Sequence, residues 1–292
     1  MVTKKDYDKI SAIKIERLTK TSYQMNSIHS VAASGFNQGT LYDSNRPSYT
    51  DQALRYISDI LSELSTLNRK DLAYDVLELG AGTGKFTEKF TACISQDVKY
   101  LATEPSEAFL HTLRSKVPSF VECVACTANA LPLPNNSVKL VIAAQCFHWF
   151  ANYESLQELY RVLVPGGRFV MLWNNKDWTV PWVKSIEDIL TQYYEEDTPR
   201  AVTYKWKQVI ESFPGFTLKG HYMLPGIEMK GDRDFIVGHF SSISVIASLS
   251  EEEKQEALAK FHNVLDSSEL TQHLLEIQIP FHTEIYDVEK TV

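Results

Sequence analysis

The sequence predicts an α/β fold in which a doubly wound, mostly parallel sheet is covered by helices on both faces. Three observations carry this prediction. Short apolar runs typical of buried strands alternate with segments of helical periodicity between about residues 74 and 173. A glycine-rich turn, Gly80 to Gly84, separates the first run from the helix after it. Alternating strands and helices are joined by right-handed crossovers, which makes the sheet parallel and puts helices on both faces.

The expected elements begin near residue 49. Apolar residues at helical spacing predict a helix from Tyr49 to Leu67, and the run from Tyr74 to Leu79 predicts the first buried strand. The elements predicted next, in chain order, are helix Lys85 to Ile94, strand Val98 to Thr103, helix Ser106 to Ser115, strand Phe120 to Ala125, strand Lys139 to Ala144, helix Tyr153 to Leu163 and strand Gly167 to Trp173. Pro165-Gly166-Gly167 is expected to form a sharp stop between the last of these helices and the strand that follows.

The pattern changes after residue 173. The later elements are predicted as two aromatic-rich helices within residues 178 to about 212, strand Phe216 to Leu224, helices Asp232 to Ala247 and Ser250 to Leu265, and a last strand from Gln278 to Val288. We therefore expect one domain over residues 31–292. Its cofactor-binding core spans about 70–175, and helices at about 178–212 and 232–265 cap the substrate side. Residues 1–30 are polar and weakly patterned, and partial disorder is expected there.

Composition and charge argue against several classes of function. The net charge of −8 argues against broad nucleic-acid binding, which requires clustered Lys and Arg. No apolar run approaches the roughly 18 residues of a membrane span, and the N-terminus lacks the apolar region of a signal peptide. Cys123 and Cys126 form a lone C-x2-C pair without a second pair of ligands, so no metal site is predicted. We expect a cytoplasmic protein.

The stretch "DVLELGAGTGKF" holds a glycine turn directly after a predicted strand. Gly80 permits a tight turn, and Gly82 lets a ligand approach the backbone closely. The next helix presents free N–H groups to a polar ligand. The G-x-G-x-G spacing lacks one residue of the G-x-G-x-x-G turn that holds a dinucleotide, which argues against an NAD-dependent reductase. Glu78, just before the turn, is a good neighbour for a cationic ligand and a poor one for a pyrophosphate.

Glu104 ends the second predicted strand, in "YLATEPS". A carboxylate at this position can accept hydrogen bonds from both hydroxyls of a ribose. The alternative is that Glu104 is only a helix-capping acid before Ser106. A nucleoside ligand with a positive centre indicates S-adenosylmethionine.

At this point the chain resembles the class I S-adenosylmethionine-dependent methyltransferases, over roughly Phe36 to Trp173. It looks most like the small-molecule branch that includes trans-aconitate methyltransferases. The resemblance is carried by "LYDSNRPSY", "VLELGAGTGKFT", "ANALPLPNNSVKLVIAAQCFHWF" and "LYRVLVPGGRFVMLWNN". It implies a seven-stranded, mostly parallel, Rossmann-like methyltransferase fold with a helical cap. It also implies an enzyme that moves a methyl group from S-adenosylmethionine to a small molecule. The sequence does not indicate whether this enzyme is a monomer or a homodimer.

The resemblance also implies roles for individual residues. The residues implied to bind the cofactor are Tyr42, Arg46, Glu78, Gly80, Gly82, Gly84, Glu104, Pro105, Thr127, Ala128, Asn129 and Gln145. Thr127 departs from the family pattern, in which an Asp often accepts from the adenine amine. Arg46 suits a carboxylate of the cofactor or of an acidic substrate, or is a surface charge. The residues expected at the acceptor site are Phe36, His148, Trp149, Trp173, Asn174, Trp178, His239 and Phe240.

His148 follows the fourth predicted strand of the sheet, in "QCFHWF", at the edge where open parallel sheets bind ligands. It can act as a general base, bind an acidic acceptor without proton transfer, or pack structurally. The first expectation for the acceptor is a carboxylate, which gives a methyl ester. The alternatives are O- or N-methylation of a phenol or amine with His148 as base, and a non-catalytic protein that binds S-adenosylmethionine or a partner.

Overall fold

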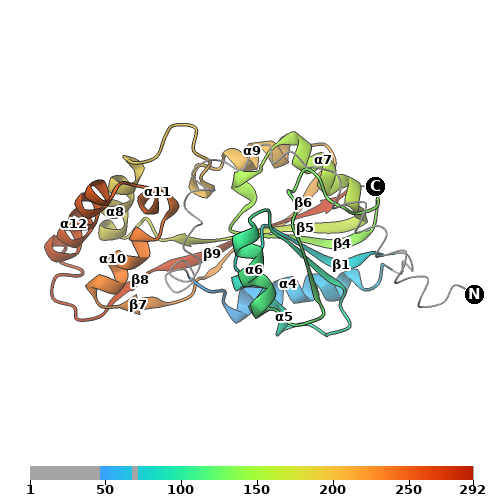
Figure 1. Ribbon diagram of the computed structural model, residues 1–292, viewed down its shortest axis with the longest axis horizontal. Coiled ribbons are helices and arrows are strands. Elements are labelled where there is room, and N and C mark those ends of the chain that lie inside the picture. The colour runs from blue at the N-terminus through green and yellow to red at the C-terminus, as the bar shows by residue number, and fades with distance from the viewer. Residues whose placement is uncertain (1–46, 68–71, 292) are drawn as a thin grey trace, which may run out of the picture.

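The computed structural model describes residues 47–67 and 72–291. Three residues with predicted site roles, Phe36, Tyr42 and Arg46, lie outside these ranges, as does the polar segment 1–30. The described chain forms a sheet flanked by helices and, beside it, a smaller group of helices (Figure 1).

Seven strands form one sheet in the order β3-β2-β1-β4-β5-β9-β6. The strands are β1 (Tyr74–Leu79), β2 (Tyr100–Thr103), β3 (Val121–Val124), β4 (Val138–Ala144), β5 (Leu163–Lys176), β6 (Phe216–Pro225) and β9 (Phe281–Lys290). The pairs from β3 to β5 are parallel, whereas β9 runs antiparallel to both of its neighbours. The predicted seven-stranded, mostly parallel sheet is confirmed.

Alternate residues of the strands pack into two apolar cores, one on each face of the sheet. Leu77 of β1 packs on the side of α7 (Tyr153–Val162) and α9 (Lys205–Ser212). Its neighbour Val76 packs on the opposite side, with α4 (Asp51–Leu64), α5 (Lys85–Thr91) and α6 (Glu107–Lys116). Successive strand side chains point to opposite faces, so a short run that is apolar at every position can bury both.

The predicted stop at Pro165-Gly166-Gly167 is wrong, because β5 begins before it, at Leu163. The pairing shifts at this point: Val138 lies opposite Leu163, whereas Leu140 lies opposite Arg168. Gly166 has φ +77°, which glycine adopts without strain. The three residues therefore interrupt the pairing inside β5, and the change from helix to strand comes earlier, between Val162 and Leu163.

Two later elements are each divided in the structure. The predicted helix from Asp232 to Ala247 is two helices, α10 (Arg233–Ser241) and α11 (Ser244–Ala247). The predicted last strand is β8 (Ile277–Ile279) and β9, separated by Pro280. A proline has no N–H for a strand ladder, which explains the break.

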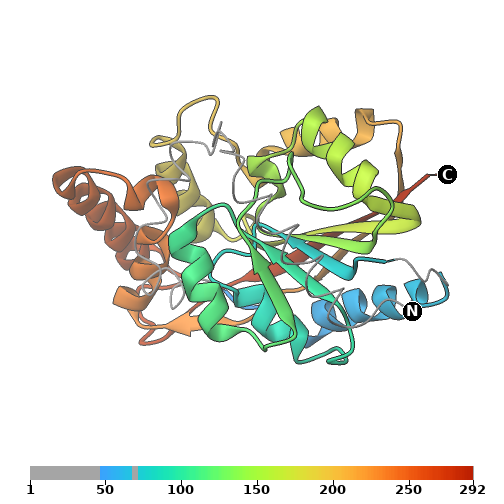
Figure 2. The same ribbon diagram turned by 45° about the vertical axis from the view of Figure 1, so that its right-hand side comes forward.

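A cap lies beside the carboxyl ends of the parallel strands, at the left of Figure 1, and Figure 2 shows the same separation from a second angle. It consists of α8 (Pro181–Thr191), α10, α11, α12 (Glu251–Ser267), β7 (Met229–Gly231) and β8. Residues of these elements form their own apolar core, around Ile186, Phe240 and Phe261. The expected assignment of the whole of 178–212 to the cap is wrong: α9 packs on the sheet through Trp206 and Ile210.

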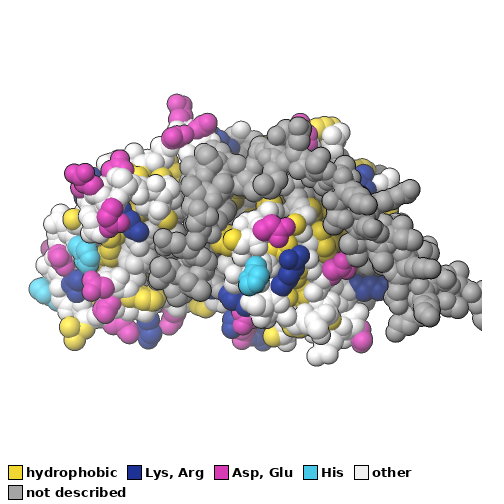
Figure 3. Space-filling model, in the orientation of Figure 1, with side chains coloured by type: hydrophobic (Ala, Val, Ile, Leu, Met, Phe, Trp, Pro, Cys, Tyr) yellow, Lys and Arg dark blue, Asp and Glu magenta, His cyan; other side chains and the backbone are white. Residues whose placement is uncertain are grey.

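Charges of both signs are dispersed over the described surface in the view of Figure 3. Of the helices in residues 47–67 and 72–291, none is long and apolar enough to cross a membrane. The same residues contain no group of three or more His, Cys, Asp or Glu side chains that could hold a metal ion.

Candidate active site

A cavity of about 570 Å³ lies at the carboxyl ends of the parallel strands, between the sheet and the cap. Its walls come from segments far apart in the sequence, from Pro47 to Phe281 of β9. The predicted site residues that line it are Glu78, Gly80, Gly82, Glu104, Pro105, Thr127, Ala128, Asn129, Gln145, His148, Trp149, Asn174, Trp178 and His239. The fold thus brings the residues predicted for the cofactor and those predicted for the acceptor into one space.

The glycine turn forms the floor of the cavity. Gly80, Gly82 and Gly84 have φ of +58°, +59° and +88°, a backbone conformation that other residues rarely adopt. A Cβ atom on Gly82 would have no neighbour within 4 Å, so the space above this backbone is open to a ligand. Gly84 does not line the cavity, in contrast to the prediction: a Cβ there would lie 2.8 Å from Leu113 of α6. Its role is close packing of α5 against α6.

Glu104 follows β2 and is 5% exposed. Its Oε2 accepts a hydrogen bond from the Gly82 N–H at 2.9 Å, and its Oε1 accepts one from the Ser106 N–H at 2.9 Å. The side chain that caps α6 is that of Ser106, whose Oγ accepts from the Phe109 N–H. The carboxylate therefore ties the glycine turn to the end of β2, and burial raises its pKa.

Glu78 is a second buried acid at the cavity wall, 1% exposed. Its Oε2 accepts hydrogen bonds from the hydroxyls of Thr87, at 2.8 Å, and Tyr100, at 2.6 Å. Burial raises its pKa to about 7, and the nearby Glu104 charge acts in the same direction. Two buried acids beside one cavity favour a cationic ligand, since each carboxylate is costly to bury without a positive partner.

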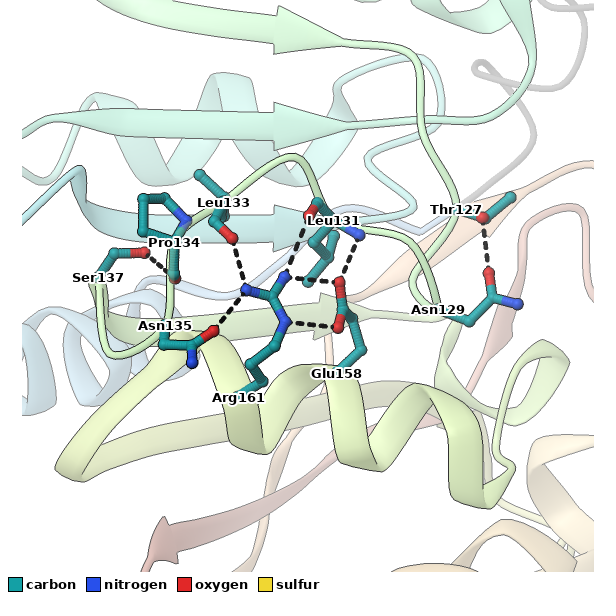
Figure 4. A network of polar contacts seen from close by, with 9 residues as sticks. All are labelled: Thr127, Asn129, Leu131, Leu133, Pro134, Asn135, Ser137, Glu158 and Arg161. Atoms are coloured by element: carbon teal, nitrogen blue, oxygen red, sulfur yellow. Dashed lines mark hydrogen bonds and ion pairs between the residues drawn. The ribbon is translucent and has the colours of Figure 1, made fainter. Parts of the chain in front are cut away.

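The loop between β3 and β4 is held by an ion pair on α7 (Figure 4). Arg161 donates to the carbonyl oxygens of Leu131, at 3.2 Å, and Leu133, at 2.6 Å, and pairs with Glu158 at 2.7 Å. Glu158 in turn accepts from the Leu131 N–H at 2.8 Å. This network fixes the chain just after Thr127, Ala128 and Asn129, which line the cavity.

His148 lies in the short 3-10 helix η1 (Phe147–Trp149), where the chain leaves β4. The reversal begins at Gln145, whose φ is +64°. The Trp173 Nε1–H donates to His148 Nδ1 at 3.2 Å. Burial lowers the pKa of His148 to about 3, so the imidazole is neutral at physiological pH.

Two residues predicted for the acceptor site do not line the cavity. Trp173 is 1% exposed and stacks on Trp206, with ring centroids 4.2 Å apart. Phe240 is fully buried in the core of the cap. Trp173 packs in the core of the sheet and Phe240 in the core of the cap, so the prediction that they line the acceptor site was wrong for both.

The cap side of the cavity contains charged residues that the sequence did not indicate. Lys176 Nζ lies 5.5 Å from the ring centroid of Trp178 and 5.8 Å from that of Phe281. Arg200 forms an ion pair with Glu187 on α8, and its Cζ lies 4.1 Å above the ring of Tyr194. The one available signal was Lys176, which lies three residues after a predicted strand. Glu187 and Arg200 lie 13 residues apart in a segment without a motif.

Comparison with known proteins decides the family. Residues 77–171 match the family described as "Methyltransferase domain". An uncharacterized methyltransferase-like protein of Schizosaccharomyces pombe is 35% identical over 255 residues, which cover 85% of this chain and 92% of that protein. The chain belongs to the class I S-adenosylmethionine-dependent methyltransferases.

Solved structures share the fold of this methyltransferase at low sequence identity. A putative type II methyltransferase from Anaeromyxobacter dehalogenans superposes with a TM-score of 0.56 at 19% identity, covering 84% of this chain and 97% of that one. A loganic acid methyltransferase, solved with SAH, superposes with a TM-score of 0.59 at 12% identity, covering 89% and 97%.

The cofactor of the methyltransferase is S-adenosylmethionine, and the cavity suits it. The open space above Gly82 admits a ligand against the backbone. The buried acids Glu78 and Glu104 suit a molecule that carries both a positive charge and hydroxyl groups. When bound, this cofactor supplies an electrophilic methyl group.

Replacing Arg161 with Met is expected to weaken cofactor binding by about fivefold, because the loop of residues 127–137 loses charge-assisted hydrogen bonds worth roughly 1 kcal/mol in net terms. Titration calorimetry with S-adenosylhomocysteine measures the effect. Arg55→Met, an exposed change on α4, is the matched control and should leave the affinity unchanged. Equal affinities of the two variants would contradict a role for the Glu158–Arg161 pair in ordering the site.

Proposed function

We propose that this methyltransferase methylates the carboxylate of a small organic acid and releases a methyl ester. The single observation that carries the proposal is the pair of cations, Lys176 and Arg200, on the cap side of the cavity. Glu187 forms an ion pair with Arg200 in this wall, and both cations lie against aromatic rings, Lys176 at Trp178 and Arg200 at Tyr194. Such a wall favours a ligand with one anionic group and an apolar body.

Within this proposal the sheet side of the cavity holds the cofactor. Glu104 accepts hydrogen bonds from the ribose hydroxyls through the lone pairs that Gly82 and Ser106 leave open. Pro105 lies against the adenine, whose edge meets residues 127–129. Gln145 contacts the methionyl part, and Glu78 with the glycine turn faces the sulfonium. Thr127 donates its hydroxyl to Asn129 Oδ1 at 2.6 Å, so its oxygen remains available as an acceptor.

A carboxylate acceptor requires little chemistry from the protein. It is already ionised at neutral pH, so its oxygen attacks the methyl carbon without a base. The protein then contributes alignment and the exclusion of water. A phenol or amine acceptor would need a base, and burial of His148, which lowers its pKa to about 3, makes it a poor one.

The proposal is tested by assaying release of S-adenosylhomocysteine with size-matched sets of carboxylic acids, phenols and amines. Turnover with acids, and methyl esters among the products, would support it. Turnover with phenols or amines alone would overturn it in favour of O- or N-methylation. Cofactor binding without turnover of any compound would favour the non-catalytic alternative.

Replacing Lys176 with Met is expected to raise KM for a carboxylate acceptor by about tenfold and to change kcat less. The side chain keeps its length, but a charge-assisted hydrogen bond worth about 1.5 kcal/mol is lost. Lys184→Met, on the exposed side of α8, is the matched control. Unchanged KM in the Lys176 variant would show that the acceptor does not meet this cation.

A further inference from the structure

The contact between Trp173 and His148 fixes which nitrogen of the imidazole carries the proton. An indole N–H can only donate, so the nitrogen that receives it must have a free lone pair. That nitrogen is Nδ1 of His148, at 3.2 Å. In a neutral imidazole the other nitrogen, Nε2, then bears the hydrogen. A proton on Nδ1 would face the indole N–H directly, so this contact excludes both the other tautomer and the imidazolium.

The two sides of the ring have different surroundings. Nδ1 faces inward to Trp173, which is 1% exposed and belongs to the core of the sheet. His148 is enclosed by the protein, and the exposed part of its side chain belongs to the cavity wall. Nδ1 is occupied by the Trp173 N–H, so Nε2 is the ring nitrogen left for a molecule in the cavity. The hydrogen of Nε2 is therefore the polar group that His148 offers to a bound molecule.

The indole that sets this arrangement is itself held firmly. Trp173 lies in β5, and its ring stacks on Trp206 of α9 with centroids 4.2 Å apart. Trp206 Nε1–H donates to the Ala201 carbonyl oxygen at 2.9 Å. Ala201 is the neighbour of Arg200, and both line the cavity. The two stacked indoles thus connect the imidazole to the loop that carries the acceptor-side guanidinium.

We propose that His148 is a hydrogen-bond donor that orients the acceptor through Nε2–H, and that Trp173 is the positioning residue that fixes it in this role. With a carboxylate acceptor, the donor would hold one oxygen and leave the other to form a bond to the methyl carbon, while the methyl–sulfur bond breaks and S-adenosylhomocysteine leaves. This second statement rests on the function proposed above. The assignment of the tautomer, and of His148 as donor instead of base, does not.

The first test is spectroscopic and needs no substrate. In the protein labelled with 15N-histidine, the long-range 1H–15N spectrum should show His148 with a protonated Nε2 and an unprotonated Nδ1. The signal is assigned by its loss in His148→Gln. Trp173→Phe should convert it to a mixture of tautomers, whereas Trp206→Phe, which disturbs the same stack but not the N–H donor, should leave it as Nε2–H. A wild-type spectrum with a protonated Nδ1 would overturn the proposal.

The second test is kinetic and remains valid if Trp173→Phe does not fold. The amide nitrogen of a glutamine can occupy the position of Nε2 and donate in its place. His148→Gln is expected to retain turnover within about threefold of the wild type, and His148→Ala to lose at least tenfold. Equal losses in the two variants would overturn the donor assignment, because glutamine is no base.

The outcomes also separate the inference from the proposed function. If the Nε2–H tautomer is found and Gln rescues turnover of a phenol or amine, the donor assignment stands and the carboxylate proposal fails. If acids are methylated but Gln does not rescue, the carboxylate proposal stands and the donor assignment fails.

Discussion

Replacing Glu104 with Ala is expected to weaken the binding of S-adenosylhomocysteine by about 10- to 100-fold. Hydrogen bonds to a charged group are worth roughly 1.5–3 kcal/mol each, and the proposed ribose contact is of this kind. The same change removes the acceptor of the Gly82 N–H, which holds the glycine turn in place. Both losses act on the cofactor side of the cavity.

Titration calorimetry measures the affinity, and thermal melting shows whether the fold survives. Glu107→Ala is the matched control, because Glu107 is an exposed acid in the first turn of α6. The wild type should bind S-adenosylhomocysteine and not NADH. Unchanged affinity of the Glu104 variant for S-adenosylhomocysteine would remove Glu104 from the cofactor site.

Between pH 4.5 and 8, the free energy of unfolding of the wild type is expected to fall by about 3 kcal/mol more than that of Glu78→Gln. The pKa of Glu78 is about 7 in the folded protein and 4.5 in the reference state. A carboxyl whose folded pKa is raised binds more protons when folded. The stabilisation of the folded state by protonated Glu78 is therefore fully present below pH 4.5 and is lost as the pH rises through 7. Gln stays neutral, and its amide oxygen can still accept from Thr87 and Tyr100.

Urea unfolding of the ligand-free protein at pH 5 and pH 8 gives the two free energies of unfolding. The wild type should lose stability between these values, and the Gln variant should lose less. The stability of the variant should still fall somewhat with rising pH, because burial also raises the pKa of Glu104. Glu88→Gln, an exposed change on α5, should behave like the wild type. Parallel curves for Glu78→Gln and wild type would show that Glu78 is solvated.

The features that sequence analysis located correctly are local. Examples are the apolar run of β1, the glycines at positive φ and the acid directly after β2, each of which is visible within a few residues of sequence. Ligands bind at the carboxyl ends of parallel strands, so the position of these residues in the site follows from the strand that each one adjoins. Helix starts were recognisable for the same reason. Ser250, with Glu253 three residues later, forms the capping box that opens α12.

Errors occurred where packing between distant elements decides the outcome. Trp173 and Phe240 read as pocket residues because they are aromatic and near the right strand or helix, but each fills a core. The interrupted pairing around Gly166 and the placement of α9 on the sheet depend on strand register and helix docking, which leave no periodic signal in the sequence.

By itself the sequence determined the strand and helix order of the parallel part of the sheet, the glycine turn and the two acids of the cofactor side, because backbone preference and apolar periodicity act over a few residues. Only the tertiary structure decided that Lys176, Glu187 and Arg200 meet at one wall, and that the Trp173 indole faces His148 Nδ1. The ion pair of Glu187 with Arg200 joins residues 13 positions apart, and the contact of Trp173 with His148 joins residues 25 positions apart. Their geometry is set by how the cap and the sheet bury their separate cores, and the tautomer of His148 follows from it.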